Sequence, residues 1–384
     1  MPALERTTNG RALNRHRAVS ATNDRIGPPI LATVPQPILI DSETIAGGYS
    51  VPTPYPGIAL VTARSDRTIQ APLPARAGRS VECPDGGERR DGRAMIPGQF
   101  DYVRPASLDD AIRILSEREG EAKLLSGGYS LLPLMKLRLA QPGLLVDLRD
   151  VSGLDSIVES DDHLRIGARA THRSVNEHPI IRERYPMLAE LTGGIGDPQV
   201  RNWGTVGGSI AHADPASDWP AAVLAIGGDV ICRGPGGERA IRTRDFFVDT
   251  FTTAIEPTEV LIEVRLPSRP RGAGAGYTKL ERRVGDFATV GVAAVVRLAD
   301  GRIDRSGIGL TGVAETPFAA TDAEAVLNGN APSDELFRRA GEAAAAQSRP
   351  SADVRGPVDY KRAMVAEMTV RSLRKAVERA LSYS

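Results

Sequence analysis

Two pairs of adjacent glycines, each beside hydroxyl side chains, are the residues best suited to chemistry in this chain of 384 residues. The first pair is Gly127-Gly128, in the stretch KLLSGGYSLLP that begins at Lys123. Adjacent glycines let consecutive backbone N–H groups converge on an anion with no Cβ in the way, and a helix that follows adds partial positive charge. The pattern predicts contact with a phosphate. Taken alone the pattern is weak, because paired glycines after a strand usually form only a tight turn.

The second pair, Gly207-Gly208, stands between Thr205 and Ser209 in the stretch RNWGTVGGSIAHADPASD, residues 201–218. The two pairs are about 80 residues apart, so two loops could hold one pyrophosphate from both sides. The carboxylates of Asp214 and Asp218 would repel phosphate but accept hydrogen bonds from ribose hydroxyls. Ser217 and Asp218 could also cap a helix.

Other patterns favour neither a metal nor a Rossmann fold. His212 and Asp214 could be metal ligands, but no other histidine has matching spacing. The two cysteines, Cys83 and Cys232, are too few for an iron–sulfur cluster and suggest no disulfide framework. The G-x-G-x-x-G pattern at 307–312 follows polar residues and precedes Pro317, so we interpret it as a glycine-rich strand. Any redox chemistry would therefore need an organic cofactor.

Composition makes nucleic-acid or membrane binding improbable. The 48 basic and 48 acidic residues give a formal net charge of zero, so the chain has no overall positive charge to attract nucleic acid or an anionic membrane. The longest apolar runs, such as Val292–Val296, are much shorter than the roughly 20 residues of a membrane helix. The first residues also lack the apolar core of a signal peptide, so we expect a soluble, cytoplasmic protein.

The texture of the chain changes near Met95. Residues 1–94 are rich in proline, contain no lysine and show no sustained periodicity, which predicts a disordered extension or a start assigned too early. Residues 95–150 predict β-α-β-α-β with a small parallel sheet, beginning near Phe100–Val103. Residues 151–268 predict an α+β unit, with helices near 172–192 and 218–225 and sequential, antiparallel strands at 163–167, 229–233, 238–242 and 260–266.

A glycine-rich stretch, 267–276, predicts a linker. Beyond it we expect a domain over 277–384, with a three-stranded meander at 277–282, 290–298 and 302–311, then helices at 333–347 and 358–381. In the last helix, Met364, Met368, Leu373, Val377 and Leu381 form an apolar face, which we interpret as core.

Taken together, SGGYSLLPLMKLRLA and GTVGGSIAHADPASD closely resemble the FAD-binding medium subunits of molybdenum hydroxylases. This family includes the medium chain of aerobic carbon monoxide dehydrogenase and the flavin portion of xanthine dehydrogenases. The resemblance extends over 95–384 through FDYVRPASLDDA, KLERRVGDFATVGVAA and DVRGPVDYKRAMV, in the same order. It implies the two-subdomain FAD-binding fold of the vanillyl-alcohol-oxidase type over 95–268, followed by a C-terminal domain of three antiparallel strands and helices.

The resemblance also implies which residues bind FAD. By position they are Lys123, Leu124, Leu125, Ser126, Gly127, Gly128, Tyr129, Ser130, Thr205, Val206, Gly207, Gly208, Ser209, Asp218, Leu261 and Lys279. The family often has His, Gln or Thr where this chain has Tyr129, which leaves the role of that side chain open but not that of the backbone. The resemblance implies neither a catalytic side chain nor a metal ligand.

The implied function is electron transfer through FAD. In the family, substrate is oxidised on a large molybdopterin-binding subunit, and electrons pass through a small [2Fe-2S] subunit to the flavin and then to an external acceptor. A dimer of heterotrimers is the implied assembly. Two alternatives stay open: a free-standing flavin oxidase of the same fold, and a flavin-free assembly or regulatory protein. Against the oxidase, the stretch after residue 277 is short and neither loop has a His or Cys for covalent flavin.

Overall fold

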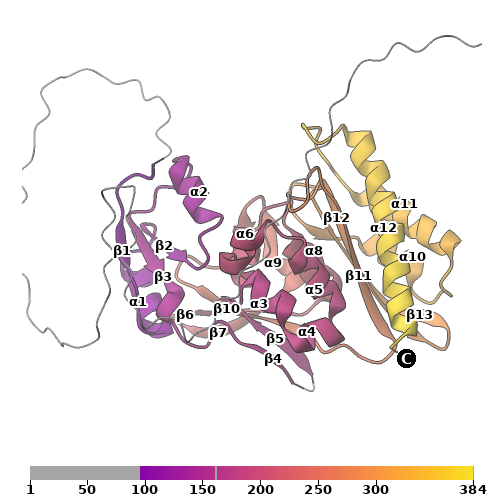
Figure 1. Cartoon of the computed structure of the whole chain (residues 1–384), viewed down its shortest axis with the longest axis horizontal. Coiled ribbons are helices and arrows are strands. Elements are labelled where there is room, and N and C mark those ends of the chain that lie inside the picture. The colour runs from indigo at the N-terminus through magenta and orange to yellow at the C-terminus, as the bar shows by residue number, and fades with distance from the viewer. Residues whose placement is uncertain (1–95, 161, 384) are drawn as a thin grey trace, which may run out of the picture. The chain divides into compact units, whose positions relative to one another are not determined.

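The structure is a computed structural model that describes residues 96–160 and 162–383. The predicted disordered extension or misassigned start, residues 1–94, lies outside the described residues. The described chain is of the α+β class and contains three larger sheets, which follow one another in chain order (Figure 1).

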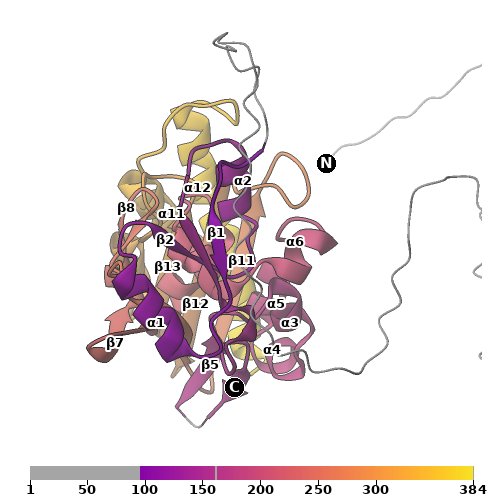
Figure 2. The same cartoon turned by 90° about the vertical axis from the view of Figure 1, so that its left-hand side faces the viewer.

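The first sheet is the small parallel sheet predicted for residues 95–150. Its strands are ordered β1-β3-β2, and both neighbouring pairs are parallel. Helix α1 begins after Ser107, whose hydroxyl accepts a hydrogen bond from the Asp110 N–H, and it packs against this sheet (Figure 2). The elements are β1 Asp101–Val103, α1 Leu108–Glu117, β2 Ala122–Leu125, α2 Leu131–Lys136, β3 Leu144–Asp147 and the 3₁₀ turn η1 Leu148–Asp150.

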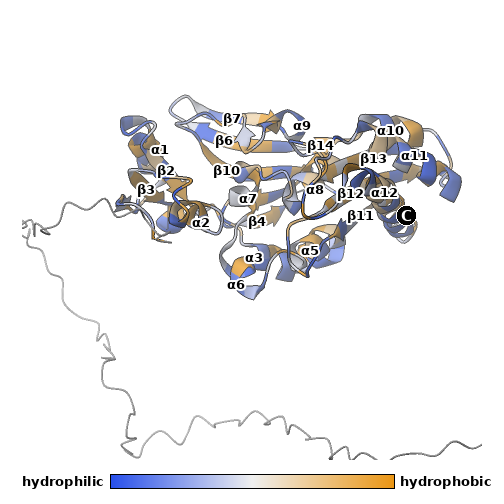
Figure 3. Ribbon diagram, turned by 90° about the horizontal axis from the view of Figure 1, so that it is seen from above, coloured by the Kyte–Doolittle hydropathy of each residue, from blue (hydrophilic) through white to orange (hydrophobic). Residues whose placement is uncertain are grey.

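The second sheet has five strands in the order β4-β5-β10-β6-β7, and all neighbouring pairs are antiparallel, as predicted. The expected sequential order is wrong, because β10 lies between β5 and β6. Central β10 is hydrophobic along much of its length (Figure 3). The strands are β4 Ile157–Glu159, β5 His163–Gly167, β6 Asp229–Gly234, β7 Gly237–Arg242 and β10 Val260–Pro267. The remaining elements are α3 His172–Glu177, α4 Pro179–Arg184, α5 Pro186–Gly193, α6 Pro198–Trp203, α7 Val206–His212, α8 Asp218–Ile226, α9 Thr243–Phe246, β8 Phe247–Asp249 and β9 Thr252–Thr253.

The third sheet has four antiparallel strands, β11-β12-β13-β14, where the sequence predicted three. The additional strand, β14, contains only Phe318 and Ala319, too few residues to show a period of two. Helix α12 covers β11 and β12. Of its predicted core face, Met368 and Leu373 are buried and Met364 and Val377 pack against the core, but Leu381 is 64% exposed at the end of the helix, so that part of the prediction is wrong. The elements are β11 Ala273–Leu280, β12 Val290–Ala299, β13 Arg302–Thr311, β14 Phe318–Ala319, α10 Thr321–Leu327, α11 Asp334–Gln347 and α12 Val358–Leu381.

The glycines of the predicted linker have a packing role instead. Strand β11 already begins at Ala273, so the expectation of a linker through residue 276 is wrong. A Cβ on Gly274 would lie 2.0 Å from the Ala376 carbonyl oxygen of α12, and one on Gly276 would lie 2.5 Å from the Ser372 oxygen. Glycine is therefore needed here for close contact between a strand and a helix, not for flexibility.

The G-x-G-x-x-G pattern has a similar explanation. Gly307 and Gly309 lie in β13, where added Cβ atoms would lie 1.9 Å from the Ala225 oxygen and 2.0 Å from the Ala221 oxygen of α8. These glycines bring α8 onto the third sheet, so the interpretation as a glycine-rich strand is confirmed.

Candidate cofactor site between two glycine loops

The first glycine loop, residues 126–130, connects the end of β2 to the start of α2. Gly128 has φ of +81°, a backbone conformation that glycine adopts at little cost. Within the described chain, the N–H groups of Gly127, Gly128 and Tyr129 donate no hydrogen bond. Tyr129 is 42% exposed. The loop therefore presents consecutive unused donors, which suits an anionic group.

The second glycine loop begins at Gly204, after α6, and runs directly into α7. Thr205 caps α7: its hydroxyl accepts a hydrogen bond from the Gly208 N–H at 3.2 Å. The Gly207 N–H donates to the Ala168 oxygen at 2.8 Å, and a Cβ on Gly207 would lie 2.5 Å from the Ala168 Cβ. The N–H groups of this glycine pair are therefore already used, and the loop offers a surface rather than a set of donors.

Sequence analysis predicted neither α6 nor α7, although signals for both were present. Asp197 caps α6, and Pro198 follows at its first position. Thr205 caps α7 in the same way. A capping residue indicates a helix start only when a periodic apolar pattern follows it. Helices of six or seven residues are too short to show such a pattern.

The two loops touch each other. The hydroxyl oxygens of Ser126 and Thr205 are 3.0 Å apart and share a hydrogen bond. A Cβ on Gly127 would lie 2.0 Å from the Trp203 carbonyl oxygen, so the first loop requires glycine where it meets the second. A Cβ on Gly208, by contrast, would come close only to the Thr205 hydroxyl, at 2.7 Å. Because Gly208 has no side chain, there is open space beside it. A pyrophosphate could occupy this space and accept hydrogen bonds from the unused N–H groups of the first loop.

Asp218 and Lys279, both predicted as cofactor-binding, form a buried ion pair. The Lys279 Nζ lies 3.2 Å from Asp218 Oδ2 and 3.1 Å from Glu281 Oε2, and it donates to the Gly194 oxygen at 3.3 Å. The Tyr277 hydroxyl donates to Asp218 Oδ1. Asp218 is at the start of α8 and Lys279 is on β11, so this cluster joins the second and third sheets.

Burial dominates the electrostatics of this cluster. Desolvation raises the pKa of Asp218, although Lys279 and the Tyr277 hydrogen bond lower it. Desolvation and the Asp218 charge both hold the pKa of Tyr277 well above its usual value. The tyrosine is therefore a neutral donor, and Lys279 is the counter-charge that makes an ionised Asp218 tolerable in this environment.

Leu261 and Lys123 have simpler surroundings. Leu261 is buried on β10 and packs into the core of the second sheet. The next residue, Ile262, accepts a hydrogen bond from Ala168 at 2.9 Å, and Ala168 in turn contacts the second loop. Lys123 lies exposed on β2, three residues before Ser126. The backbone near Leu261 thus supports the loop, while its side chain faces the core.

The C-terminal domain holds the turn that follows α7. Gly312 N–H donates to the Pro215 oxygen at 2.7 Å, and Ala288 N–H donates to the Ala216 oxygen at 3.2 Å. The Thr311 hydroxyl lies 2.6 Å from the Pro215 oxygen and 2.8 Å from the Ser217 oxygen. The turn between the second loop and Asp218 is therefore fixed by residues of the third sheet.

A buried histidine that sequence analysis did not select supports the second loop from behind. His172 Nδ1 accepts a hydrogen bond from the Trp219 indole N–H at 3.1 Å. The His172 backbone N–H donates to the Gly204 oxygen at 2.9 Å. Burial, with a smaller contribution from the Arg201 charge, lowers the pKa of His172 to about 4, so the imidazole is neutral near pH 7. A neutral ring is required because Nδ1 must be free to accept.

Two absences apply to residues 96–160 and 162–383. No cluster of three or more His, Cys, Asp or Glu side chains in this part could hold a metal ion. No helix in the same part is long and apolar enough to cross a membrane.

The two glycine loops meet in an α+β chain and offer unused N–H donors, which suit a phosphate-bearing cofactor. Residues 98–269 match the family described as FAD binding domain in molybdopterin dehydrogenase. Residues 275–376 match the CO dehydrogenase flavoprotein C-terminal domain.

Known relatives agree over nearly their whole lengths. The carbon monoxide dehydrogenase medium chain of Hydrogenophaga pseudoflava is 41% identical over 282 residues, 73% of this chain and 98% of the relative. The nicotine 6-hydroxylase medium subunit of Paenarthrobacter nicotinovorans is 38% identical over 275 residues, which are 72% of this chain and 96% of the relative. A carbon monoxide dehydrogenase structure from Hydrogenophaga pseudoflava superposes with a TM-score of 0.72 at 43% identity, covering 74% of this chain and 99% of that chain.

The chain belongs to the carbon monoxide dehydrogenase medium-chain family, the FAD-binding medium subunits of molybdenum hydroxylases of the carbon monoxide dehydrogenase and xanthine dehydrogenase type. It is the medium subunit of a multi-subunit oxidoreductase. The family expected from the sequence is thereby confirmed, as is its cofactor.

Proposed function

We propose that the two glycine loops hold the pyrophosphate of FAD and that the chain passes electrons from iron–sulfur clusters to an external acceptor. FAD, when bound, supplies the redox group that this chain's own side chains lack. The unused N–H groups of Gly127, Gly128 and Tyr129 would donate to phosphate oxygens. The free space beside Gly208 would let the phosphates approach the second loop.

The contact between the loops is the single observation that best supports this proposal. Ser126 and Thr205 come from segments 79 residues apart, yet their hydroxyls share a hydrogen bond. This contact places the donor-rich loop and the open side of Gly208 next to each other. A turn with only a structural role would need neither the three unused donors nor the unfilled space.

The remaining predicted residues would position the cofactor. Asp218, fixed by Tyr277 and Lys279, would keep a carboxylate oriented for hydroxyl groups of the cofactor. Strand β2 would fix the first loop through Lys123, Leu124 and Leu125. Helix α7 would fix the second loop through Val206 and Ser209. The Ser209 hydroxyl lies 2.8 Å from that of Ser217, which connects α7 to the turn before Asp218.

For the assembly we propose a large molybdopterin-binding subunit and a small [2Fe-2S] subunit as partners, arranged as a dimer of heterotrimers in the cytoplasm. The sequence contains too few cysteines for the clusters themselves. Substrate choice would then belong to the large subunit.

Reconstitution tests this division of labour. The full chain loaded with FAD is mixed with carbon monoxide, a purine or an aldehyde, and the flavin absorbance is followed by stopped flow. We expect no bleaching until both partner subunits are added. Bleaching by the chain alone at a rate near that of the mixture would indicate a free-standing oxidase. Failure of the folded chain to take up FAD at all would point to an assembly or regulatory protein.

A further inference from the structure

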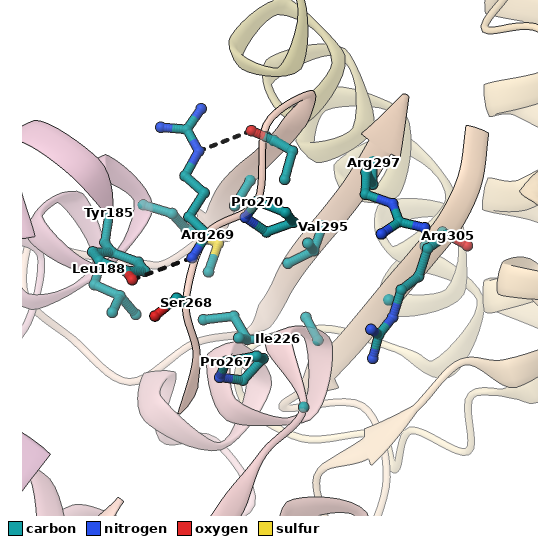
Figure 4. Close-up of a pocket in the computed structure, with 18 of the residues that line it drawn as sticks. Tyr185, Leu188, Ile226, Pro267, Ser268, Arg269, Pro270, Val295, Arg297 and Arg305 are labelled. Carbon is teal, nitrogen blue, oxygen red and sulfur yellow. Dashed lines mark hydrogen bonds between the residues drawn. The ribbon is translucent and has the colours of Figure 1, made fainter. Parts of the chain in front are cut away.

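A second cavity lies at the opposite end of α8 from Asp218. It has a volume of about 220 Å³ and is formed where α5, the C-terminal end of α8 and the β10–β11 connection meet strands β12 and β13. Figure 4 shows Tyr185 and Leu188 on one side, with Arg297 and Arg305 on the other. None of the predicted FAD-binding residues lines this cavity. It is therefore separate from the cofactor site.

The interior is apolar, but the lining is strongly cationic. Met187, Leu188, Ile226 and Val295 contribute apolar surface. No Asp or Glu lines the cavity, whereas five arginines do: Arg184, Arg244, Arg269, Arg297 and Arg305. An apolar cavity that carries only positive charge is suited to a molecule with an apolar body and an anionic group.

Three of these arginines already have counter-charges. Arg184 pairs with Glu159, Arg244 with Glu324 and Arg297 with Asp304. These carboxylates neutralise three of the five guanidinium groups. Those of Arg269 and Arg305 remain.

The two remaining arginines have no carboxylate partner in the described chain. Arg269 is half-buried, and its guanidinium donates only to the carbonyl oxygens of Ala273, Arg184 and Arg379. The Arg305 guanidinium forms no hydrogen bond or ion pair with a described residue, although the Arg305 backbone is paired in the third sheet. The Nε–H of Arg184 is also buried without a partner. The Arg269 guanidinium also stacks on the Tyr383 ring, 3.9 Å from its centroid. The unpartnered charge at this cavity is therefore that of Arg305, and the unused buried donor is the Nε–H of Arg184.

The register of the third sheet makes this arrangement costly without an anion. Arg297 and Arg305 stand directly opposite each other on β12 and β13. Like charges in directly opposed positions destabilise a sheet, and Asp304 compensates only the Arg297 member. An anion between the two guanidinium groups would remove the repulsion and give Arg305 a partner.

From this geometry we propose that the cavity binds a small amphipathic carboxylate, with its carboxylate at Arg305 and Arg297 and its apolar body against Ile226 and Val295. The volume is larger than the ~150 Å³ that accommodates benzene and smaller than the roughly 300 Å³ at which drug-sized pockets begin. A medium-chain or aryl carboxylate matches this size, whereas the folded end of a polypeptide does not.

Calorimetric titration of the full FAD-loaded chain with octanoate tests the proposal. We expect one binding site, and weaker binding of the uncharged octanol. Arg305→Gln should weaken octanoate binding about tenfold, as expected for the loss of a charge-assisted hydrogen bond. Arg339→Gln is the matched control, because Arg339 is also exposed and without a described partner but lies on α11 away from the cavity. Octanoate that does not bind, or that binds Arg305→Gln as well as wild type, overturns the proposal.

A cavity-filling variant tests the apolar part. Val295→Phe should abolish octanoate binding while FAD content, read from absorbance, stays unchanged; full octanoate binding in this variant would place the ligand elsewhere. The titration is repeated with the assembled three-subunit complex, which should bind octanoate equally well. If only the isolated chain binds, the cavity is covered by a partner subunit and the assignment to a small acid is wrong.

Discussion

The hydroxyl oxygens of Ser126 and Thr205 lie 3.0 Å apart, although 79 residues separate them in the chain. Thr205 uses the same oxygen to cap α7 through the Gly208 N–H. One hydroxyl thus joins the two glycine loops and starts the helix that carries the second glycine pair. Any change in Thr205 should therefore affect loop contact, helix start and cofactor binding together.

Gly208→Val should abolish FAD binding without unfolding the chain. The added side chain would occupy the open space beside the loop, where its Cβ would come close only to the Thr205 hydroxyl. Flavin stoichiometry and circular dichroism are measured on the same sample. Gly236→Val, at a surface turn where nothing lies within 4 Å, is the control and should keep its flavin. Full flavin content in Gly208→Val would contradict the two-loop cradle.

Gly127→Val is expected to behave differently. Its Cβ would overlap the Trp203 carbonyl oxygen, so the variant should push the loops apart and lower the melting temperature as well as the flavin content. A melting temperature equal to that of wild type would show that the loops separate freely.

Ser126→Ala and Thr205→Val should show coupled effects on stability. Loss of the Thr205 cap should cost about 1 kcal/mol, and the shared hydrogen bond should add a coupling of roughly 0.5–1.5 kcal/mol. A double-mutant cycle, with free energies of unfolding from urea titration, measures this coupling. Additive effects would mean that the 3.0 Å contact contributes nothing in solution.

Lys279→Met should be more damaging than the double variant Asp218→Asn with Lys279→Met. Removing only the lysine leaves a buried carboxylate without its counter-charge, which costs about 3–5 kcal/mol, whereas the double variant removes both charges. Free energies of unfolding and FAD dissociation constants are compared. Arg113→Met, in the exposed Arg113–Glu117 pair, is the control and should cost at most about 1 kcal/mol.

His172→Asn should make stability less dependent on pH between about 4 and 6.5. Burial lowers the pKa of His172 from 6.5 to about 4, so the unfolded chain takes up a proton first as the pH falls. The stability from the neutral ring is complete above pH 6.5 and is lost towards pH 4, by roughly 3 kcal/mol. Asn keeps an acceptor for the Trp219 N–H but does not titrate. Equal slopes of melting temperature against pH in both proteins would contradict a buried neutral histidine.

Much of the fold could be predicted because its elements are amphipathic and have clear ends. Helix α1 has a capping serine and an acidic first turn, and β5 matches the predicted 163–167. The short elements α6, α7 and β14 were not predicted, because β14 has two residues and the capping signals of α6 and α7 precede helices too short to show a period. The glycines of β11 suggested a linker, because their packing role depends on α12, which is distant in the sequence. The glycines of β13 were correctly interpreted as part of a strand.

The site could be predicted in part. Glycine pairs indicate loops, and the family resemblance placed Asp218 and Lys279 near the cofactor. The ion pair between these two residues, the His172 support and the contact of Gly127 with Trp203 are tertiary relationships. No local pattern encodes them. The assignment of individual FAD-binding residues stays a prediction.

The hydrogen bonds from Gly312 and Ala288 to the Pro215–Ala216 turn bear on how such subunits can evolve. The two family domains, 98–269 and 275–376, adjoin in sequence, yet a turn of the first is completed by main-chain donors of the second. Recombination that exchanged only one of them would leave carbonyl groups beside the cofactor loop without their partners. We therefore expect the pair to be inherited as one module, with insertions tolerated at its outer ends rather than at the join.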